Sequence, residues 1–227
     1  MEREAVHTVQ YLKFIYYNIM ALDLNGNKLF STSVGPRGEA IRSIVTDGLI
    51  CHLDAGNKNS YSGTGTSWTD LTGNGYTATL VNGVGYNSSG YLTFDGVDDY
   101  VITASVANYK SISTWAYIDS KSTYFADARS GSPVGYLWFG EIGSDWNQFY
   151  INGSSVSVSP ASFPTGQWFH FYARNTSFRT GTITLFCRFS LSEFNPGRWS
   201  VFKFYNRDLS PTEIIQDYDA QRARFGL

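Results

Sequence analysis

The 227-residue sequence is poor in charge, cysteine and histidine. Asp, Glu, Lys and Arg make up only 16% of the residues, and the formal net charge is −2. The chain therefore lacks the basic field that attracts a phosphate backbone, and no nucleic-acid partner is expected. Its two cysteines and three histidines form no Cys-x-x-Cys or Cys/His cluster, so the sequence does not predict a zinc site.

Long hydrophobic runs are also lacking, and the apolar stretch near the N-terminus is short. A membrane-spanning helix needs about 20 apolar residues, whereas Lys13, Asn18 and Asp23 interrupt this stretch. Glu2 and Glu4 replace the positive start of a secretory signal. We therefore expect neither a membrane partner nor signal-dependent export.

Aromatic residues and glycine are abundant instead. Aromatics reach 17% of the chain and glycines number 22, a composition that favours pleated strands joined by turns. From residue 47 onward, short runs of alternating polarity are separated by glycine-rich turns. Ten runs are predicted as strands, namely residues 49–54, 77–81, 91–94, 100–103, 111–118, 135–139, 149–151, 167–173, 182–189 and 200–205. Ten strands exceed one flat sheet, so we predict an all-β fold of two packed antiparallel sheets.

The two ends of the chain depart from this pattern. Residues 20–46 show no sustained period and are predicted to form an extended arm that stays extended or docks onto a neighbouring surface. Met20 begins a segment that reads like an ordinary protein start, so residues 1–19 are interpreted as an upstream extension. At the other end, Ser210-Pro-Thr-Glu213 is a capping box that predicts a helix over about 211–222. The predicted domains are 1–46, extension and arm, and 47–227, the globular domain.

The two cysteines lie on the apolar side of alternating runs. Cys51 follows Leu49 and precedes Leu53 at period two, and Cys187 follows Leu185 in the same way. We predict that both are buried free thiols behaving as small hydrophobic groups. A disulfide between them is the alternative. The two cysteines therefore do not decide whether the protein works in an oxidising or a reducing compartment.

Five sequence blocks carry a resemblance to a known fold family. They are WTDLTGNG (68–75), YLTFDGVDDYV (91–101), SISTWAY (111–117), GQWFH (166–170) and FYNRDLSPTEI (204–214). In this order they resemble the laminin G-like, concanavalin A-like lectin–glucanase jelly-roll domain. The resemblance implies a two-sheet jelly-roll sandwich with one short C-terminal helix. The family includes lectins, adhesins, enzyme accessory modules and virion proteins, so the fold does not decide the function.

A narrower resemblance is to single-domain structural proteins of tailed bacteriophages. It is carried by DGLICHLDAGN (47–57), YSGTGTSW (61–68) and QRARFG (221–226). It implies a multicopy or homo-oligomeric virion protein, assembled in the host cytoplasm and displayed on the virion surface as a capsid decoration or a head or tail fibre component. Residues 20–46 would contact the major capsid or fibre protein, and the domain would bind host-surface glycans weakly and many times over. The alternative is a cellular carbohydrate-binding or adhesion module.

Catalytic patterns are not recognisable in the sequence. A glycosidase needs two carboxylates roughly 5 to 9.5 Å apart, whereas Glu141 and Asp145 would lie about 13 Å apart along one strand. No Gly-x-Ser-x-Gly elbow precedes a helix, and His52 and His170 alternate with apolar neighbours as structural histidines do. We therefore predict that the protein is not an enzyme and needs no cofactor, with calcium as the one alternative.

Two groups of residues are candidates for binding. Aromatic rings beside amides and carboxylates suit sugar rings, and the candidate carbohydrate contacts are Tyr136, Trp138, Glu141, Trp146, Asn147 and Tyr150. Asp95, Asp98 and Asp99 are candidate calcium ligands, because this cation takes roughly six to eight oxygens. Asp95-Gly96 also suits a tight turn whose aspartates bond to their own backbone. Both interpretations of the aspartates stay open.

Overall fold

The computed structural model describes residues 19–22, 28–34, 40–41, 43–130, 132–157 and 159–227. It divides into two compact units, Met1–Ile44 and Val45–Leu227. In the described part of the first unit, β1 (Ile19–Leu22), β2 (Lys28–Val34) and β3 (Ala40–Ile41) form an antiparallel sheet in that order. The predicted arm thus contains strands that pair with one another, because pairing satisfies backbone groups that an isolated arm leaves to water. The predicted upstream extension lies, apart from Ile19, outside the described residues.

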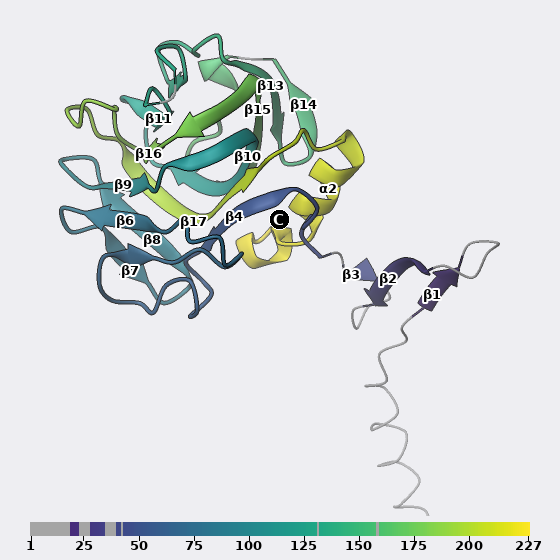
Figure 1. The fold of residues 1–227 in the computed structure, drawn as a ribbon. Helices are drawn as coiled ribbons and strands as arrows, with labels where there is room; N and C mark the ends of the chain where they lie inside the picture. Colours follow the sequence, from purple (N-terminus) through teal and green to yellow (C-terminus); the bar gives the residue numbers. More distant parts are fainter. Residues whose placement is uncertain (1–18, 23–27, 35–39, 42, 131, 158) are drawn as a thin grey trace, which may run out of the picture. The chain divides into compact units, whose positions relative to one another are not determined.

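The second unit is a sandwich of two antiparallel sheets (Figure 1). The larger sheet runs β14-β13-β15-β10-β17-β8-β7, and β4 also pairs with β17. Its strands are β4 (Leu49–Asp54), β7 (Gly85–Asn87), β8 (Tyr91–Asp95), β10 (Val106–Ile118), β13 (Trp146–Ile151), β14 (Ser154–Val156), β15 (Trp168–Gly181) and β17 (Pro196–Tyr205). The smaller sheet runs β12-β11-β16-β9-β6-β5. Its strands are β5 (Ser67–Trp68), β6 (Ala78–Val81), β9 (Tyr100–Thr103), β11 (Tyr124–Asp127), β12 (Tyr136–Trp138) and β16 (Thr184–Leu185). The predicted all-β, two-sheet sandwich is confirmed.

The core lies between the sheets, because alternate residues of each strand face the opposite sheet. Ile112, Ala116 and Ile118 of β10 are fully buried in it. The ring of Phe125 on β11 lies 5.2 Å from that of Phe171 and 4.7 Å from that of Trp199, both on the larger sheet. Many of the aromatic rings therefore lie in the core, where their burial stabilises the domain.

Strand bounds follow the predicted segments closely where polarity alternates. Each of the ten predicted runs overlaps a strand, although β10, β13, β15 and β17 extend beyond theirs and β16 is much shorter than its run. The strands that are not predicted from the sequence are β5, β7, β11 and β14 in the second unit and β1, β2 and β3 in the first. All four residues of β11 are buried, so this strand lacks the alternation that marks a half-exposed one.

Helix α2 (Pro211–Asp219) begins at the predicted capping box. The Ser210 hydroxyl accepts from the Glu213 N–H, and the Glu213 carboxylate accepts from the Ser210 N–H at 2.8 Å. The helix ends at Asp219 and a 3₁₀ turn, η3 (Arg222–Phe225), follows, so the predicted helix over 211–222 is too long.

Within the described residues, no helix is long and apolar enough to cross a membrane.

An ionic network buried under α2 joins this helix to the larger sheet. Lys203 Nζ donates to both carboxylate oxygens of Asp217 at 2.6 Å, and Ser113 Oγ donates to Asp217 at 2.6 Å. His170 Nε2 lies 2.9 Å from Ser113 Oγ, and all four side chains are fully buried. Burial alone would raise the pKa of Asp217, but the Lys203 ammonium and the hydrogen bond from His170 outweigh it and hold that pKa well below its usual range.

Turn η3 is anchored by Arg224. Its guanidinium donates to Asp54 Oδ1 at 2.7 Å, to the Gly90 carbonyl at 2.7 Å and to Ser200 Oγ at 2.6 Å. A Cβ at Gly56 would lie 2.1 Å from the same guanidinium. A side chain at position 56 would therefore displace the guanidinium from these partners.

Both cysteines are free and buried, which confirms the prediction and excludes the disulfide. Burial, with the charges of Asp127 and Glu193, raises the pKa of Cys187 to about 12. Burial likewise raises the pKa of Cys51. Both thiols stay protonated at neutral pH and act as small apolar groups.

Replacing Asp217 by Asn should destabilise the domain strongly. Lys203 would then be a buried charge without its counter-ion, and breaking such a pair costs about 3–5 kcal/mol. Equilibrium urea unfolding measures the free energy. Asp208→Asn is the matched control, because Asp208 is 40% exposed and 3.5 Å from Arg174, and it should change stability by less than about 1 kcal/mol. Equal effects of the two substitutions would contradict this account of the network.

Stability should fall as the pH drops from about 6.5 towards 4. Burial, with the charge of Lys203, lowers the pKa of His52 to about 4, and burial lowers that of His170. The unfolded chain takes up these protons at about pH 6.5 while the folded chain does not, so protonation favours unfolding. His52 alone should contribute about 3 kcal/mol across this window. Unfolding free energies at pH 7.5 and 4.5 test this, and His52→Gln should show a smaller loss than wild type; identical losses would contradict it.

Candidate functional site

Three of the six candidate carbohydrate contacts stay together at one edge of the smaller sheet. Tyr136 and Trp138 lie half-buried on the edge strand β12, and Glu141 is exposed in the turn that follows. Leu137 between them is 1% exposed and faces the core. By the alternation of the strand, Tyr136 and Trp138 therefore point away from the core.

The other three candidates lie elsewhere. Trp146 is 2% exposed and belongs to the core between the sheets, whereas Tyr150 is 6% exposed and contacts Tyr172 in the cluster under α2. Asn147 is exposed and accepts a hydrogen bond from Arg174 at 3.1 Å. The six residues do not form one surface, because β13 belongs to the larger sheet and a register shift between Trp146 and Gln148 leaves Trp146 and Tyr150 on opposite faces.

Two residues that the sequence analysis misses complete the edge cluster, which we define as Tyr124, Arg129, Tyr136, Trp138 and Glu141. Tyr124 on β11 is opposite Trp138, and their stacked ring centroids lie 6.1 Å apart. The Arg129 guanidinium lies 5.3 Å from the Tyr124 ring centroid and 5.2 Å from that of Tyr136. Cross-strand pairing with β11 creates this cluster, and no sequence spacing signals it.

Buried Asp127 fixes the position of the cation in the edge cluster. Both of its carboxylate oxygens accept from Arg129 Nε at 3.0 Å, and this hydrogen bond is the main reason that the pKa of Arg129 is raised. Burial and the neighbouring Glu141 raise the pKa of Tyr136. The cluster therefore offers half-buried rings with a fixed guanidinium and a carboxylate beside them. Such a surface can stack on a sugar ring and bond to its hydroxyl groups.

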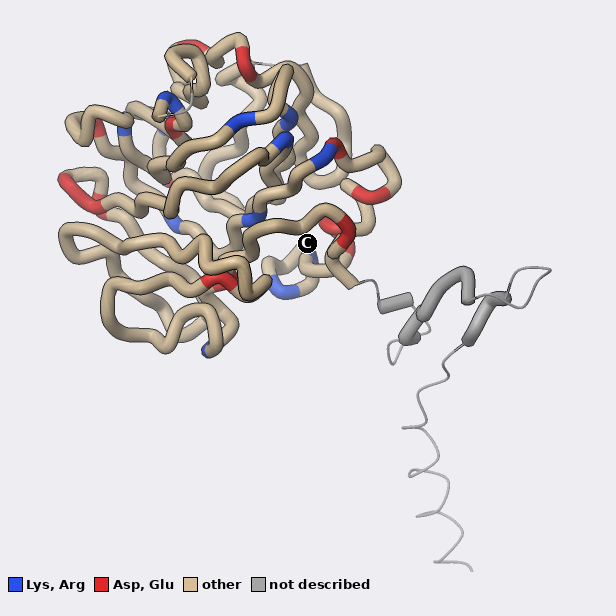
Figure 2. The backbone as a smooth tube through the Cα atoms, viewed as in Figure 1, with Lys and Arg blue, Asp and Glu red and all other residues tan. Residues whose placement is uncertain are grey.

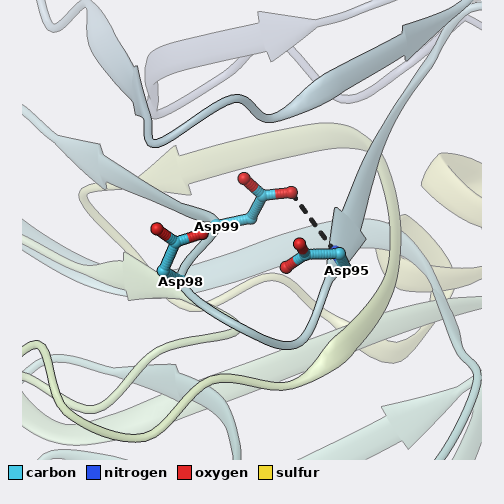
Figure 3. A group of neighbouring side chains, drawn as sticks. All are labelled: Asp95, Asp98 and Asp99. Carbon is cyan, nitrogen blue, oxygen red and sulfur yellow. Dashed lines mark hydrogen bonds between the residues drawn. The ribbon is translucent and has the colours of Figure 1, made fainter.

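Of the three candidate calcium ligands, Asp95 ends β8, and Asp98 and Asp99 lie in the loop between β8 and β9 (Figure 3). One carboxylate oxygen from each of Asp95, Asp98 and Asp99 lies within 4.8 Å of the others. Asp99 Oδ2 accepts from the Asp95 N–H at 3.3 Å, and Asp95 Oδ1 accepts from the Val97 N–H at 2.7 Å. Burial, opposed by the hydrogen bond from Asp95, raises the pKa of Asp99. Two of the three aspartates thus bond to the loop backbone, as the tight-turn interpretation predicts, and calcium binding stays a prediction.

A serine, a histidine and an aspartate do meet, although the sequence spacing did not indicate it. Ser113, His170 and Asp217 are hydrogen-bonded to one another in the network under α2. All three are fully buried, and Asp217 is paired with Lys203. In this conformation the serine cannot reach a substrate, so the group acts in stability.

Comparison with solved structures finds sialidases. The sialidase of Trypanosoma rangeli in complex with the inhibitor DANA is 17% identical, with a TM-score of 0.55, over 97% of this chain and 38% of that chain. The same sialidase with 2,3-difluorosialic acid, as a covalent intermediate, is 16% identical, with a TM-score of 0.56, over 97% and 39%. The chain thus spans less than two fifths of the length of these sialidases.

A further similar structure is the receptor-binding domain of botulinum neurotoxin C/D mosaic serotype. It is 16% identical over 78% of this chain and 52% of that chain, and its TM-score of 0.49 is too low to carry an argument. No family model and no curated protein sequence matches the chain.

These comparisons contradict the prediction that the protein is not an enzyme, because the sialidases of similar fold are enzymes. That prediction depended on the lack of a catalytic carboxylate spacing and of a Gly-x-Ser-x-Gly elbow in the sequence. Catalytic groups that come together only in the folded protein leave no such spacing. At 15–17% identity the likeness assigns no reaction to this chain. The narrower laminin G-like and bacteriophage assignments remain predictions. What the comparisons show of this chain is an all-β, sandwich-like fold.

Proposed function

We propose that the sandwich is a lectin-like carbohydrate-binding domain displayed on a tailed-bacteriophage particle. The edge cluster is the observation that carries the carbohydrate part. Tyr136 and Trp138 lie on the edge strand β12, beyond which no further strand pairs within the described residues, and Arg129 and Glu141 supply polar groups beside Tyr136. Rings flanked by a donor and an acceptor are the common composition of a sugar site.

The solved structures agree with a carbohydrate ligand. The sialidase of similar fold was solved with 2,3-difluorosialic acid, a sugar acid. The similarity of fold therefore supports a carbohydrate ligand. The edge cluster supports it independently, because its side chains are of the kinds that contact sugars. Weak contacts of this kind become effective when many copies are displayed together.

The virion part of the proposal rests on the bacteriophage resemblance of 47–57, 61–68 and 221–226. Residues 20–46 would bind the major capsid or fibre protein, and the sandwich would project from the particle as a decoration or a fibre component. The division of the chain into two compact units suits this arrangement, since one unit can bind the particle while the other stays exposed. The proposal requires no cofactor.

Trp138→Ala should weaken glycan binding by about tenfold, which corresponds to roughly 1.4 kcal/mol from one lost stacking contact. A glycan array with the wild-type chain selects the ligand, and titration calorimetry compares the variants. Phe178→Ala is the matched control, because Phe178 is a 59% exposed aromatic residue outside the edge cluster, and it should leave the affinity unchanged. Equal affinities of wild type and Trp138→Ala would contradict this site.

Sedimentation with purified bacteriophage particles tests the virion part. The full chain should co-sediment with the particles, whereas residues 45–227 should remain in the supernatant, because the first unit supplies the contact. Thermal unfolding of the shortened chain confirms that it is folded. If the full chain stays in the supernatant while both forms bind a glycan, the cellular adhesion module is the better assignment.

A further inference from the structure

A row of large side chains crosses the outer face of the larger sheet, away from the edge cluster. Trp168 on β15 is opposite Tyr117 on β10, and Tyr117 is opposite Arg198 on β17. Their strand neighbours Phe169 and Trp199 are fully buried in the core. The three side chains therefore point outward, and we call them the sheet row.

Ring and cation contacts hold the sheet row together. The Tyr117 ring centroid lies 5.8 Å from that of Trp168, and the Arg198 guanidinium lies 4.1 Å from the Tyr117 centroid. Tyr91 on β8 closes the group, 5.4 Å from Trp168 and 5.8 Å from the guanidinium. From the other side, the Phe225 ring of η3 packs 4.9 Å from Trp168. These side chains are half-buried and fixed by one another.

Arg198 has unused capacity for a hydrogen-bond acceptor. Its ion-pair partner Asp119 lies 3.7 Å away, beyond hydrogen-bond distance, and the two side chains are 35% and 42% exposed. An exposed pair of this kind contributes at most about 1 kcal/mol. Because stacking on Tyr117 fixes the plane of the guanidinium, its N–H groups are held for a planar acceptor such as a carboxylate.

The described part of the sandwich has no large patch of one charge that would outweigh the charge of Arg198 (Figure 2). Figure 2 shows that Lys and Arg are interspersed with Asp and Glu over the sandwich. Within the sheet row the cation is Arg198, and the nearby Arg224, 5.2 Å from the Phe225 ring, is already paired with Asp54 at 2.7 Å. Asp119 is the nearby group that opposes it.

We propose that the sheet row binds an acidic saccharide, a chain that contains carboxylated sugars such as uronic acids. A sugar ring stacks on Trp168, and a carboxylate of the same chain pairs with Arg198 through two hydrogen bonds. The Trp168 ring and the Arg198 guanidinium lie 5.8 Å and 4.1 Å from the Tyr117 centroid, so they are less than about 10 Å apart and one oligosaccharide can contact both. This site is separate from the edge cluster and stands whether or not the latter binds a glycan.

Titration calorimetry with tetragalacturonate and with its carboxyl-reduced, neutral counterpart tests the proposal. The wild-type chain should bind the acidic probe about tenfold more tightly than the neutral one. Arg198→Gln should abolish that preference, and Trp168→Ala should weaken binding of both probes. The matched control is Arg188→Gln, which removes the same charge from a 39% exposed arginine paired with Glu193, and it should keep the preference.

Asp119→Asn provides a test that does not depend on loss of binding. It removes the group that competes for Arg198, so the acidic probe should bind several-fold more tightly while the neutral probe is unaffected. Thermal unfolding of each variant shows that it is folded. The proposal is overturned if the wild-type chain binds both probes equally or neither, or if Arg198→Gln and Arg188→Gln behave alike. Binding of another glycan through Trp138 would concern the edge cluster alone and would not rescue the sheet row.

Discussion

The Asp217 carboxylate is the buried charge around which the outer face of the larger sheet is organised. Taking a carboxylate out of water costs several kcal/mol unless a counter-ion and hydrogen bonds replace the lost hydration. Lys203, Ser113 and His170 supply that replacement from three adjacent strands. Asp217 is part of α2, so it reaches these three side chains only when α2 packs on the larger sheet. The network therefore fixes where the chain after β17 lies. That position in turn seats Phe225 against Trp168, so the network supports the sheet row as well as the helix.

The two sheets distribute their outward residues differently. On the larger sheet, α2 covers one part of the face and the sheet row occupies another, whereas on the smaller sheet the edge cluster lies at the last strand. The outer faces of two packed sheets point in opposite directions. The domain therefore presents two surfaces of similar composition that differ in their arginine: Arg129 is hydrogen-bonded to buried Asp127, whereas Arg198 has the exposed Asp119 at 3.7 Å.

Alternation and capping were enough to predict the sandwich and helix α2, because both patterns are local. Strand pairing is not local, and this is why the site residues were predicted only in part. The segment 136–150 looked like one aromatic surface, but it crosses from β12 of one sheet to β13 of the other, which puts Trp146 in the core. Arg129 and Arg198 acquire their positions from partners on other strands. The exclusion of catalysis was wrong for a related reason, since it depended on sequence spacing alone.

The late position of α2 in the chain affects how the domain can form during synthesis. While the ribosome is still translating the strands, Lys203 already has its place in β17 but its counter-ion has not been made. Until α2 has been made, this face of the sandwich is uncovered and the Lys203 ammonium is hydrated rather than paired with Asp217. The native packing of this face is thus completed only when α2 docks, and Lys203 then exchanges its water for the Asp217 carboxylate.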